Sequence, residues 1–516
     1  AYKQQVNAGG QRYPDVNTAI DRRVDLGTLM MTYIGHGGEL GWAHERILEV
    51  SQINKWTNFD NLPLFVTATC EFSRFDDPQR TSAGEFVFLN PNGGGIGLLT
   101  TTRLVYSSPN FDIVRAFTDA AFDEIDSGMP RLGDLLVVTK INGPKNINSR
   151  NFTLLGDPAL RLAYPRYNVV TTFATDTMKA LGKVKVTGYV ADDGGQKMTG
   201  FNGVVYPVVF DKAATINTLN NDGVGVFTFA SQKNVLFKGK ASVKNGEFEY
   251  SFVVPKDISY SYGNGRISHY SQNGETDAGG YFESFKIGGS DSTAAADNTG
   301  PQLQLFLNDE KFVFGGITDE NPKLFAKLFD ENGINTTGNG IGHDIVAVLD
   351  ENTSKSIVLN DYYEAEINSY QKGSIRFPLK DLQDGKHTLR IRAFDVYNNS
   401  GEANTEFIVA KSANLALDHL LNYPNPFTTR TAFYFEHNQP GQNLDISIQI
   451  FTVSGKLVKS IDSYVYSDTF RAGPIYWDGL DDFGDKIGKG VYVYKLKVIA
   501  HTGQVVNKFE KLVVLN

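Results

Sequence analysis

Two short apolar runs near the start of the chain each lead into a residue with reactive chemistry. Residues 28–34 lead into Gly35-His36-Gly37-Gly38, and residues 62–69 lead into Cys70. Short apolar runs bounded by turn residues are typical of strands buried on both faces of a sheet. In open α/β sheets, ligands bind at the carboxyl ends of such strands. If the two strands are neighbours in a parallel sheet, His36 and Cys70 face the same crevice.

The rest of residues 1–165 alternates between helical and strand patterns. Asp15 or Asn17 is placed to cap the first helix. Alternation of strands and helices predicts an α/β three-layer sandwich. The expected helices cover residues 15–26, 45–53, 83–89, 111–125 and 132–141, and the expected further elements are a buried strand at 94–101 and a turn and strand at 152–162.

After residue 165 the apolar period changes from helical to two, which predicts β-strands separated by turns. We expect three immunoglobulin-like β-sandwich modules. Their bounds are 166–292, 301–411 and 415–516. Residues 288–301 are small and polar, which predicts a flexible linker between the first two modules.

Composition narrows the classes of function. A net charge of −9 and the absence of any Lys/Arg run argue against a nucleic-acid surface. Cys70 is the single cysteine, so no intramolecular disulfide forms. We expect no cofactor and no metal site. The histidines of the β modules lack zinc-ligand spacing, and the aspartates at 478, 481, 482 and 485 miss the EF-hand pattern, which favours turn chemistry over calcium.

A thiol beside an imidazole is the pairing that nucleophilic catalysis requires. The imidazole removes the proton from the thiol, and the thiolate attacks. Amide N–H groups near Gly37 and at Cys70 would serve as an oxyanion hole. Considered singly, a lone cysteine is more often an inert buried residue, and a lone histidine is more often structural.

Charged residues near these two positions leave two interpretations open. Glu39 and Glu71 would bias the electrostatics of the pair or be solvated loop charges. Arg74 and Arg103 would bind a carboxylate or phosphate, or form local ion pairs with an aspartate such as Asp76 or Asp77, which is the more common outcome for arginine.

The blocks 33–37 and 67–70 resemble those of the gingipain-like cysteine peptidases, in which His-Gly and a cysteine end hydrophobic runs. The sequence of residues 69–76 is more similar to the sortases of the type IX secretion system of Bacteroidota than to the gingipains. The stretches 82–85, 93–103 and 154–160 add to this resemblance. It implies that His36 is the general base and Cys70 the nucleophile. It also implies that residues 1–165 are the second half of a catalytic domain that a longer N-terminal region precedes. An acid that would orient His36 is not evident in residues 1–27.

Residues 415–516 resemble the C-terminal export domain of type IX secretion cargo, through the stretches 423–427, 477–484, 490–496 and 511–515. The combined resemblance implies a cell-surface sortase, peripherally attached to the outer membrane, that removes the signal domain from cargo and transfers the cargo to anionic lipopolysaccharide. The implied partners are cargo proteins and an outer-membrane β-barrel of the PorV type. A secreted gingipain-like endopeptidase and a non-catalytic surface adhesin remain alternatives.

Overall fold

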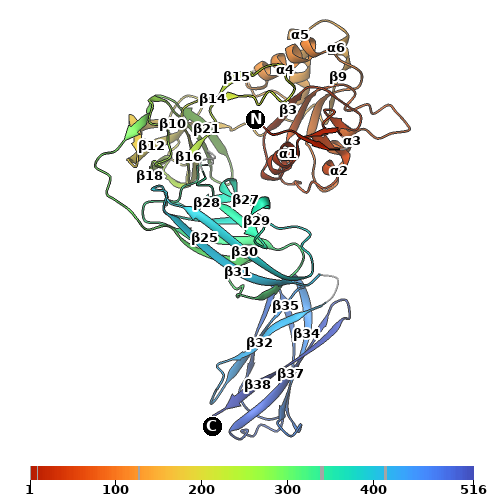
Figure 1. Ribbon diagram of the computed structural model, residues 1–516, viewed down its shortest axis with the longest axis vertical. Coiled ribbons are helices and arrows are strands. Elements are labelled where there is room, and N and C mark those ends of the chain that lie inside the picture. The colour runs from red at the N-terminus through yellow and green to blue at the C-terminus, as the bar shows by residue number, and fades with distance from the viewer. Residues whose placement is uncertain (1, 8–9, 126–127, 338–341, 412–414, 516) are drawn as a thin grey trace. The chain divides into compact units, whose positions relative to one another are not determined.

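Four strands in the order β3-β7-β8-β9 form the central sheet of the N-terminal unit in the computed structural model (Figure 1). They are β3 (Met30–Ile34), β7 (Leu64–Ala68), β8 (Gly97–Thr101) and β9 (Phe152–Leu155). β3, β7 and β8 run parallel, and β9 is antiparallel to β8. Every residue of β7 and β8 is buried, as predicted. The same prediction is wrong for β3, because it lies at the edge of the described sheet and leaves Thr32 and Ile34 exposed.

The structure describes residues 2–7, 10–125, 128–337, 342–411 and 415–515. The chain divides into two units, one made of residues 1–165 and 214–231 and the other of 166–213 and 232–516. Within the described residues, none of the helices combines the length and the apolar character that a membrane span needs.

Helices supply apolar residues to both faces of the central sheet. On one face, α1, α2 and α3 contribute to a buried cluster that contains Phe65 of β7. On the other face, α4 and α5 pack in a second cluster around Val66. Neighbouring residues of β7 thus point to opposite faces, as the period of a strand requires. The helices are α1 (Pro14–Leu26), α2 (Val50–Ile53), α3 (Ala83–Leu89), α4 (Ser107–Ala121), α5 (Leu132–Asn142) and α6 (Ile147–Asn151).

Two local predictions fail in the first fifty residues. Neither Asp15 nor Asn17 caps α1, whose N-cap residue is Tyr13. Asn17 instead donates from Nδ2 to the carbonyls of Arg46 and Ile47, at 2.9 and 2.8 Å. The helix expected at 45–53 is confined to α2, because Arg46 adopts a φ of 56° that a right-handed helix cannot contain. A small sheet precedes it, formed by β4 (Gly37–Gly38), β5 (Gly41–Trp42) and β6 (Leu48–Glu49).

Two hairpins complete the N-terminal unit. The first pairs β1 (Gln5–Asn7) with β2 (Gly10–Arg12), and the second pairs β14 (Ala214–Asn217) with β15 (Thr228–Ser231). In the turn of the second hairpin, Asn221 donates from Nδ2 to the Tyr2 carbonyl and to the Tyr13 hydroxyl, at 3.1 and 3.2 Å. Residues far along the chain are therefore built into this unit.

The first β module of the second unit is a sheet that closes on itself. Its order is β16-β13-β17-β18-β12-β10-β21-β20, and β13 also pairs with β20. Both edges of β13 are therefore paired, which removes a free edge that two separate sheets would leave. This arrangement differs from the two-sheet sandwich that the alternation predicted, because alternation fixes which residues face inward but not which strands pair. The strands of the module, of which β11, β19 and β22 form a separate small sheet, are β10 (Tyr167–Ala174), β11 (Thr177–Ala180), β12 (Lys183–Ala191), β13 (Gly203–Phe210), β16 (Val235–Lys238), β17 (Ala241–Lys244), β18 (Glu247–Val253), β19 (Gly263–Asn264), β20 (Arg266–Gln272), β21 (Asp277–Phe282) and β22 (Lys286–Ser290).

The two remaining modules each place two sheets around one buried cluster. The first combines the sheets β23-β25-β29-β28 and β24-β31-β30-β26-β27. The second combines β32-β33-β36 with β35-β34-β37-β38. The elements are β23 (Gln302–Leu307), β24 (Gly316–Thr318), β25 (Lys323–Phe329), β26 (Val346–Leu349), η1 (Thr353–Lys355), β27 (Ile357–Val358), η2 (Asn360–Tyr362), β28 (Tyr363–Ala365), β29 (Lys372–Pro378), β30 (Gly385–Phe394), β31 (Ser400–Val409), β32 (Leu417–Tyr423), β33 (Thr431–His437), β34 (Gln442–Thr452), β35 (Leu457–Ser467), β36 (Arg471–Trp477), β37 (Gly490–Ala500) and β38 (Val505–Val514).

The segment predicted to be a flexible linker is held by hydrogen bonds. Residues 286–290 belong to β22, which pairs with β11 and β19. Farther along, Asp297 accepts a hydrogen bond from Asn332 Nδ2 at 2.7 Å, and its carbonyl accepts one from Asn399 at 3.2 Å. A small polar composition therefore did not distinguish a free linker from a segment bonded to the following module.

Candidate active site

The central sheet brings His36 and Cys70 to the same edge. β3 and β7 are parallel neighbours, as predicted, and Ile34 lies opposite Ala68 in their register. His36 and Cys70 each follow these paired residues by two positions, at the carboxyl ends of the two strands. The amide of Gly35 also donates to the Ala68 carbonyl, at 3.3 Å, which extends the pairing to the first residue after β3. The catalytic roles of His36 and Cys70 remain predictions.

Cys70 lies on a tight turn after β7. Its thiol is half-buried and donates to the Val105 carbonyl, with an Sγ–O distance of 3.5 Å. The next residue, Glu71, has a φ of 52°, and its amide donates to the Arg103 carbonyl at 3.3 Å. A left-handed conformation at a residue other than glycine is uncommon and depends on the surrounding structure to maintain it. The segment that follows β8 thus holds the turn that presents the thiol.

His36 is exposed, but its backbone is held firmly. The His36 carbonyl accepts hydrogen bonds from the Tyr33 hydroxyl at 2.6 Å and from the Ala43 amide at 2.8 Å. The Tyr33 ring stacks on Trp42 with a centroid distance of 4.5 Å, and Trp42 is itself buried. Burial, with a smaller contribution from the Glu45 carboxylate, raises the pKa of Tyr33 to about 12, so this hydroxyl remains a donor across the neutral range. The hydrogen bonds from Tyr33 and Ala43 therefore fix the backbone of the loop that carries the imidazole.

The two glycines that flank His36 are required by their neighbours. A Cβ atom at Gly35 would lie 2.7 Å from the Tyr33 hydroxyl, and one at Gly37 would lie 2.5 Å from Thr69 Oγ1. Gly37 belongs to β4, where it pairs with Trp42. The position of Gly37 against the residue before Cys70 brings the His36 loop and the Cys70 turn together. The oxyanion-hole roles of Gly37 and Cys70 remain predictions.

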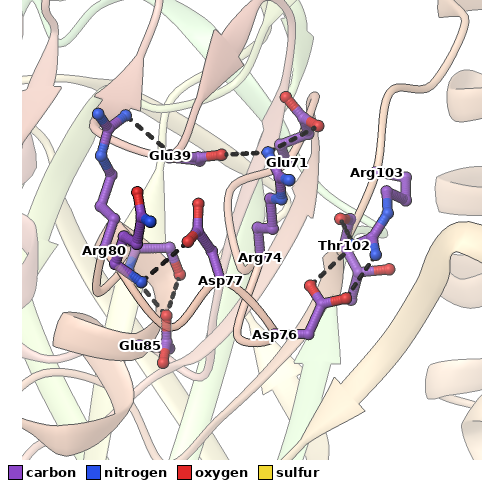
Figure 2. Close-up of polar contacts among 11 residues, drawn as sticks. Glu39, Glu71, Arg74, Asp76, Asp77, Arg80, Glu85, Thr102 and Arg103 are labelled. Carbon is purple, nitrogen blue, oxygen red and sulfur yellow. Dashed lines mark hydrogen bonds and ion pairs between the residues drawn. The ribbon is translucent and has the colours of Figure 1, made fainter.

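Ion pairs connect the same two segments (Figure 2). Glu39 accepts hydrogen bonds from Arg74 at 2.8 Å and from Arg80 at 3.0 Å, and its side chain is 12% exposed. The interpretation of Glu39 as a solvated loop charge is therefore wrong. Arg74 pairs with Glu39 and, at 3.8 Å, with Glu71, instead of with an aspartate.

Arg103 forms an ion pair with an aspartate, as one of its two interpretations from the sequence predicted. It donates to both carboxylate oxygens of Asp76, as Figure 2 shows. These hydrogen bonds lower the pKa of Asp76. The planar, two-pronged contact is the geometry that arginine favours with a carboxylate.

An acid that would orient His36 is not found. Among the described residues, no carboxylate forms a hydrogen bond or ion pair with the His36 imidazole. The aromatic group near it is His44, with a ring-centroid distance of 5.9 Å. Asp21, one of the upstream acids, accepts hydrogen bonds from Gln52 and Trp56 instead, at 2.8 and 2.7 Å. His36 forms hydrogen bonds through its carbonyl, with Tyr33 and Ala43.

The acidic residues of the β modules are engaged in turns. Asp481 accepts hydrogen bonds from the amides of Phe483 and Asp485, each at 2.9 Å, which is the turn chemistry that the sequence favoured. A different group, formed by Asp297, Asp330 and Asp395, brings three carboxylates within 4.8 Å of one another. Backbone amides two or more residues along the chain donate to each of these carboxylates.

Residues 1–163 match the model of peptidase family C25. This part of the chain is a C25 peptidase region. Family C25 is a family of cysteine peptidases, and the region contains the single thiol of the chain, Cys70. Over this region the chain is similar to the cysteine peptidases of family C25. No curated protein matches the chain.

Solved structures with similarity to the chain include C25 relatives. Latent dimeric PorU from Porphyromonas gingivalis is 30% identical, with a TM-score of 0.32, over 77% of this chain and 39% of that chain. The Arg-specific cysteine proteinase gingipain R is 14% identical, with a TM-score of 0.26, over 53% of this chain and 56% of that chain. The chain therefore covers less than two thirds of either relative.

Several residues that shape this C25 site were not identified from the sequence. Tyr33 lies inside the apolar run before His36, where its ring was counted as core and its hydroxyl carried no signal. Asn110 of α4 donates to the Ala68 carbonyl at 3.3 Å while nearly buried, yet lies 40 positions beyond Cys70. A buried polar residue on an otherwise amphipathic helix is the one signal that would have indicated it.

Proposed function

We propose that the chain is part of a cell-surface sortase that cleaves the C-terminal signal domain from secreted cargo and transfers the cargo to anionic lipopolysaccharide. The observation that supports this most directly is the placement of His36 and Cys70 at the ends of paired parallel strands within the C25 region. The resemblance of 69–76 to the type IX sortases supports transfer over simple hydrolysis, and the resemblance of residues 415–516 to a type IX export domain supports a place in this secretion system.

The first half of the proposed reaction forms a thioester. His36 takes the proton of the Cys70 thiol, and the thiolate sulfur attacks the carbonyl carbon of the peptide bond that precedes the signal domain. Amide N–H groups at Gly37 and Cys70 stabilise the negative oxygen. The carbon–nitrogen bond then breaks, and His36 returns the proton to the leaving amine of the signal domain.

The second half of the reaction releases the cargo. An amine of the lipopolysaccharide anchor attacks the thioester carbon, a new amide bond forms, and the carbon–sulfur bond breaks. The proton lost by the amine returns to the thiolate through His36. Division of the transfer into two acyl steps is what allows an acceptor other than water to take the cargo.

The β modules have a supporting role in this proposal. We interpret the C25 region as a three-layer α/β sandwich and the two-sheet modules as immunoglobulin-like. The last module would attach the protein peripherally to the outer membrane by contact with a β-barrel of the PorV type.

The experiment is the replacement Cys70→Ala in the full-length protein within cells. We expect cargo to accumulate with its signal domain attached and without its lipopolysaccharide anchor, while the variant itself unfolds at the same temperature as the parent. Cargo that is cleaved but not anchored in the parent strain would instead indicate a hydrolytic endopeptidase. Mass spectrometry of the surface protein gives a second answer, because a cargo adhesin would lose the residues from about 415 onward, whereas the proposed sortase retains them.

A further inference from the structure

A cavity of about 630 Å³ opens between the His36 loop and the Cys70 turn. Gly37, Gly38, Glu39, Glu71 and Arg80 are among the residues that line it. A Cβ atom at Gly38 would meet no heavy atom within 4 Å, so there is open space over the loop. Gly37 and Glu71, the residues that directly follow His36 and Cys70 along the chain, line this pocket, so it is placed to receive a side chain of the substrate.

Each carboxylate that lines this pocket already has an arginine partner, and the pairs of Glu39 and Glu71 are seen in Figure 2. Glu39 is paired with Arg74 and Arg80, and Glu71 is 3.8 Å from Arg74. Glu49, on the far wall, is 3.3 Å from Arg46. Together with Arg74, which lies outside the lining, the three carboxylates and the three guanidinium groups carry no net charge.

We infer that the pocket selects an uncharged side chain at one of the two residues that flank the scissile bond. This inference rests on the proposed function. A basic side chain needs a carboxylate, and each carboxylate here would have to give up an arginine to bind it. An acidic side chain needs a guanidinium group, and each of those is likewise engaged. An uncharged side chain enters without breaking an ion pair, so the desolvation cost of a charge is avoided.

Glu39 is the group that determines this neutrality. Its carboxylate is nearly buried, whereas Arg74 and Arg80 are more exposed, at 37% and 55% of their side chains. Removal of Arg80 would leave Arg74 alone between Glu39 and Glu71, which gives the group a net negative charge, and removal of the Glu39 carboxylate would leave Arg80 without its partner, which gives a net positive charge. The two changes are therefore expected to shift specificity in opposite directions.

The test uses two series of peptides that carry a cargo cleavage junction. One series varies the residue before the scissile bond and the other varies the residue after it, among Gln, Arg and Glu. For the parent protein, we expect kcat/KM for Gln to exceed that for Arg and for Glu by about tenfold at one of the two positions.

Two variants and a control decide the question. Arg80→Gln is expected to raise the Arg-to-Gln ratio of kcat/KM by about tenfold, and Glu39→Gln is expected to raise the Glu-to-Gln ratio by a similar factor. The control is Arg103→Gln, which breaks the Arg103–Asp76 pair at the same edge but outside the pocket, and which should change neither ratio. Melting temperatures of all variants show whether the site remains folded.

The outcomes separate this inference from the proposed function. If the parent cleaves these peptides but Arg80→Gln does not raise the Arg-to-Gln ratio and Glu39→Gln does not raise the Glu-to-Gln ratio, the pocket does not select by charge and the inference is overturned. If Arg103→Gln shifts the ratios equally, the effect is a general one of surface charge, which also overturns it. If Cys70→Ala cleaves the peptides as well as the parent does, the proposed function itself has failed.

Discussion

Removal of the Tyr33 hydroxyl should slow catalysis without unfolding the protein. In Tyr33→Phe the ring still stacks on Trp42, so the aromatic packing is retained. The change deletes the 2.6 Å hydrogen bond from the hydroxyl to the His36 carbonyl. That carbonyl still accepts from the Ala43 amide at 2.8 Å, so no buried acceptor is left without a partner. The loss is thus that of one net hydrogen bond, about 1 kcal/mol.

The expected kinetic effect follows from that free energy. If the full 1 kcal/mol is lost from the stabilisation of the transition state, kcat falls about fivefold, because 1.36 kcal/mol corresponds to a tenfold change in rate. KM should change little, since Tyr33 lies beneath the loop and donates to its backbone. A second assay follows alkylation of Cys70 by iodoacetamide across pH 5 to 9. A poorly held His36 should move the acid limb of that profile.

Tyr164→Phe is the matched control. The Tyr164 hydroxyl donates to the Ala121 carbonyl at 2.7 Å, it is also partly buried, and burial raises its pKa as it does for Tyr33. The control should lose a similar amount of stability and retain full kcat. The positioning role of Tyr33 would be refuted if both variants lost activity equally, or if Tyr33→Phe changed melting temperature alone.

Two further predictions concern different parts of the chain. Gly37→Ala should reduce kcat at least tenfold, because the new Cβ would lie 2.5 Å from Thr69 Oγ1 and 2.8 Å from the Gly41 carbonyl and would push the two loops apart; unchanged activity would show that this approach is not needed. In the first β module, burial lowers the pKa of His269 to about 4, so this residue stays neutral in the folded state while the unfolded chain binds a proton below its ordinary value of 6.5. Stability is then fully present above pH 6.5 and falls as the pH drops toward 4, by about 3 kcal/mol. Hydrogen exchange of the peptide 247–254 in the parent and in His269→Asn checks this, and an equal acid sensitivity in both would contradict it.

Much of the N-terminal unit could be read from its pattern, because parallel strands buried on both faces produce continuous apolar runs. β7, β8 and α3 lie where the sequence placed them, and the register of β3 against β7 put His36 and Cys70 at one edge. The failures have a common cause. Edge exposure at β3, the closure of the first β module and the partners of Arg74 depend on which segments meet in space, and a local pattern does not contain that information.

The charges around the site show the same limit at the level of single residues. Asp76 lies 27 positions from Arg103 and is close to it only in the folded chain, yet the sequence favours an ion pair of this arginine with an aspartate such as Asp76, because that is the common outcome for arginine. The partners of Glu39 were harder to predict, since Arg74 and Arg80 lie 35 and 41 positions away along the chain. The sequence indicates that such a carboxylate needs a partner once it is buried, but it does not indicate which one.

The hairpin of β14 and β15 has a consequence for how this protein is made. Residues 214–231 belong to the N-terminal unit although they are inserted within the first β module. During synthesis from the N-terminus, Tyr2 and Tyr13 emerge first and must wait for Asn221 before their contacts with it can form. The N-terminal unit is therefore complete only after residue 231 has been synthesised, and a chain that ends at Pro165 would lack the hairpin and its contacts with Tyr2 and Tyr13.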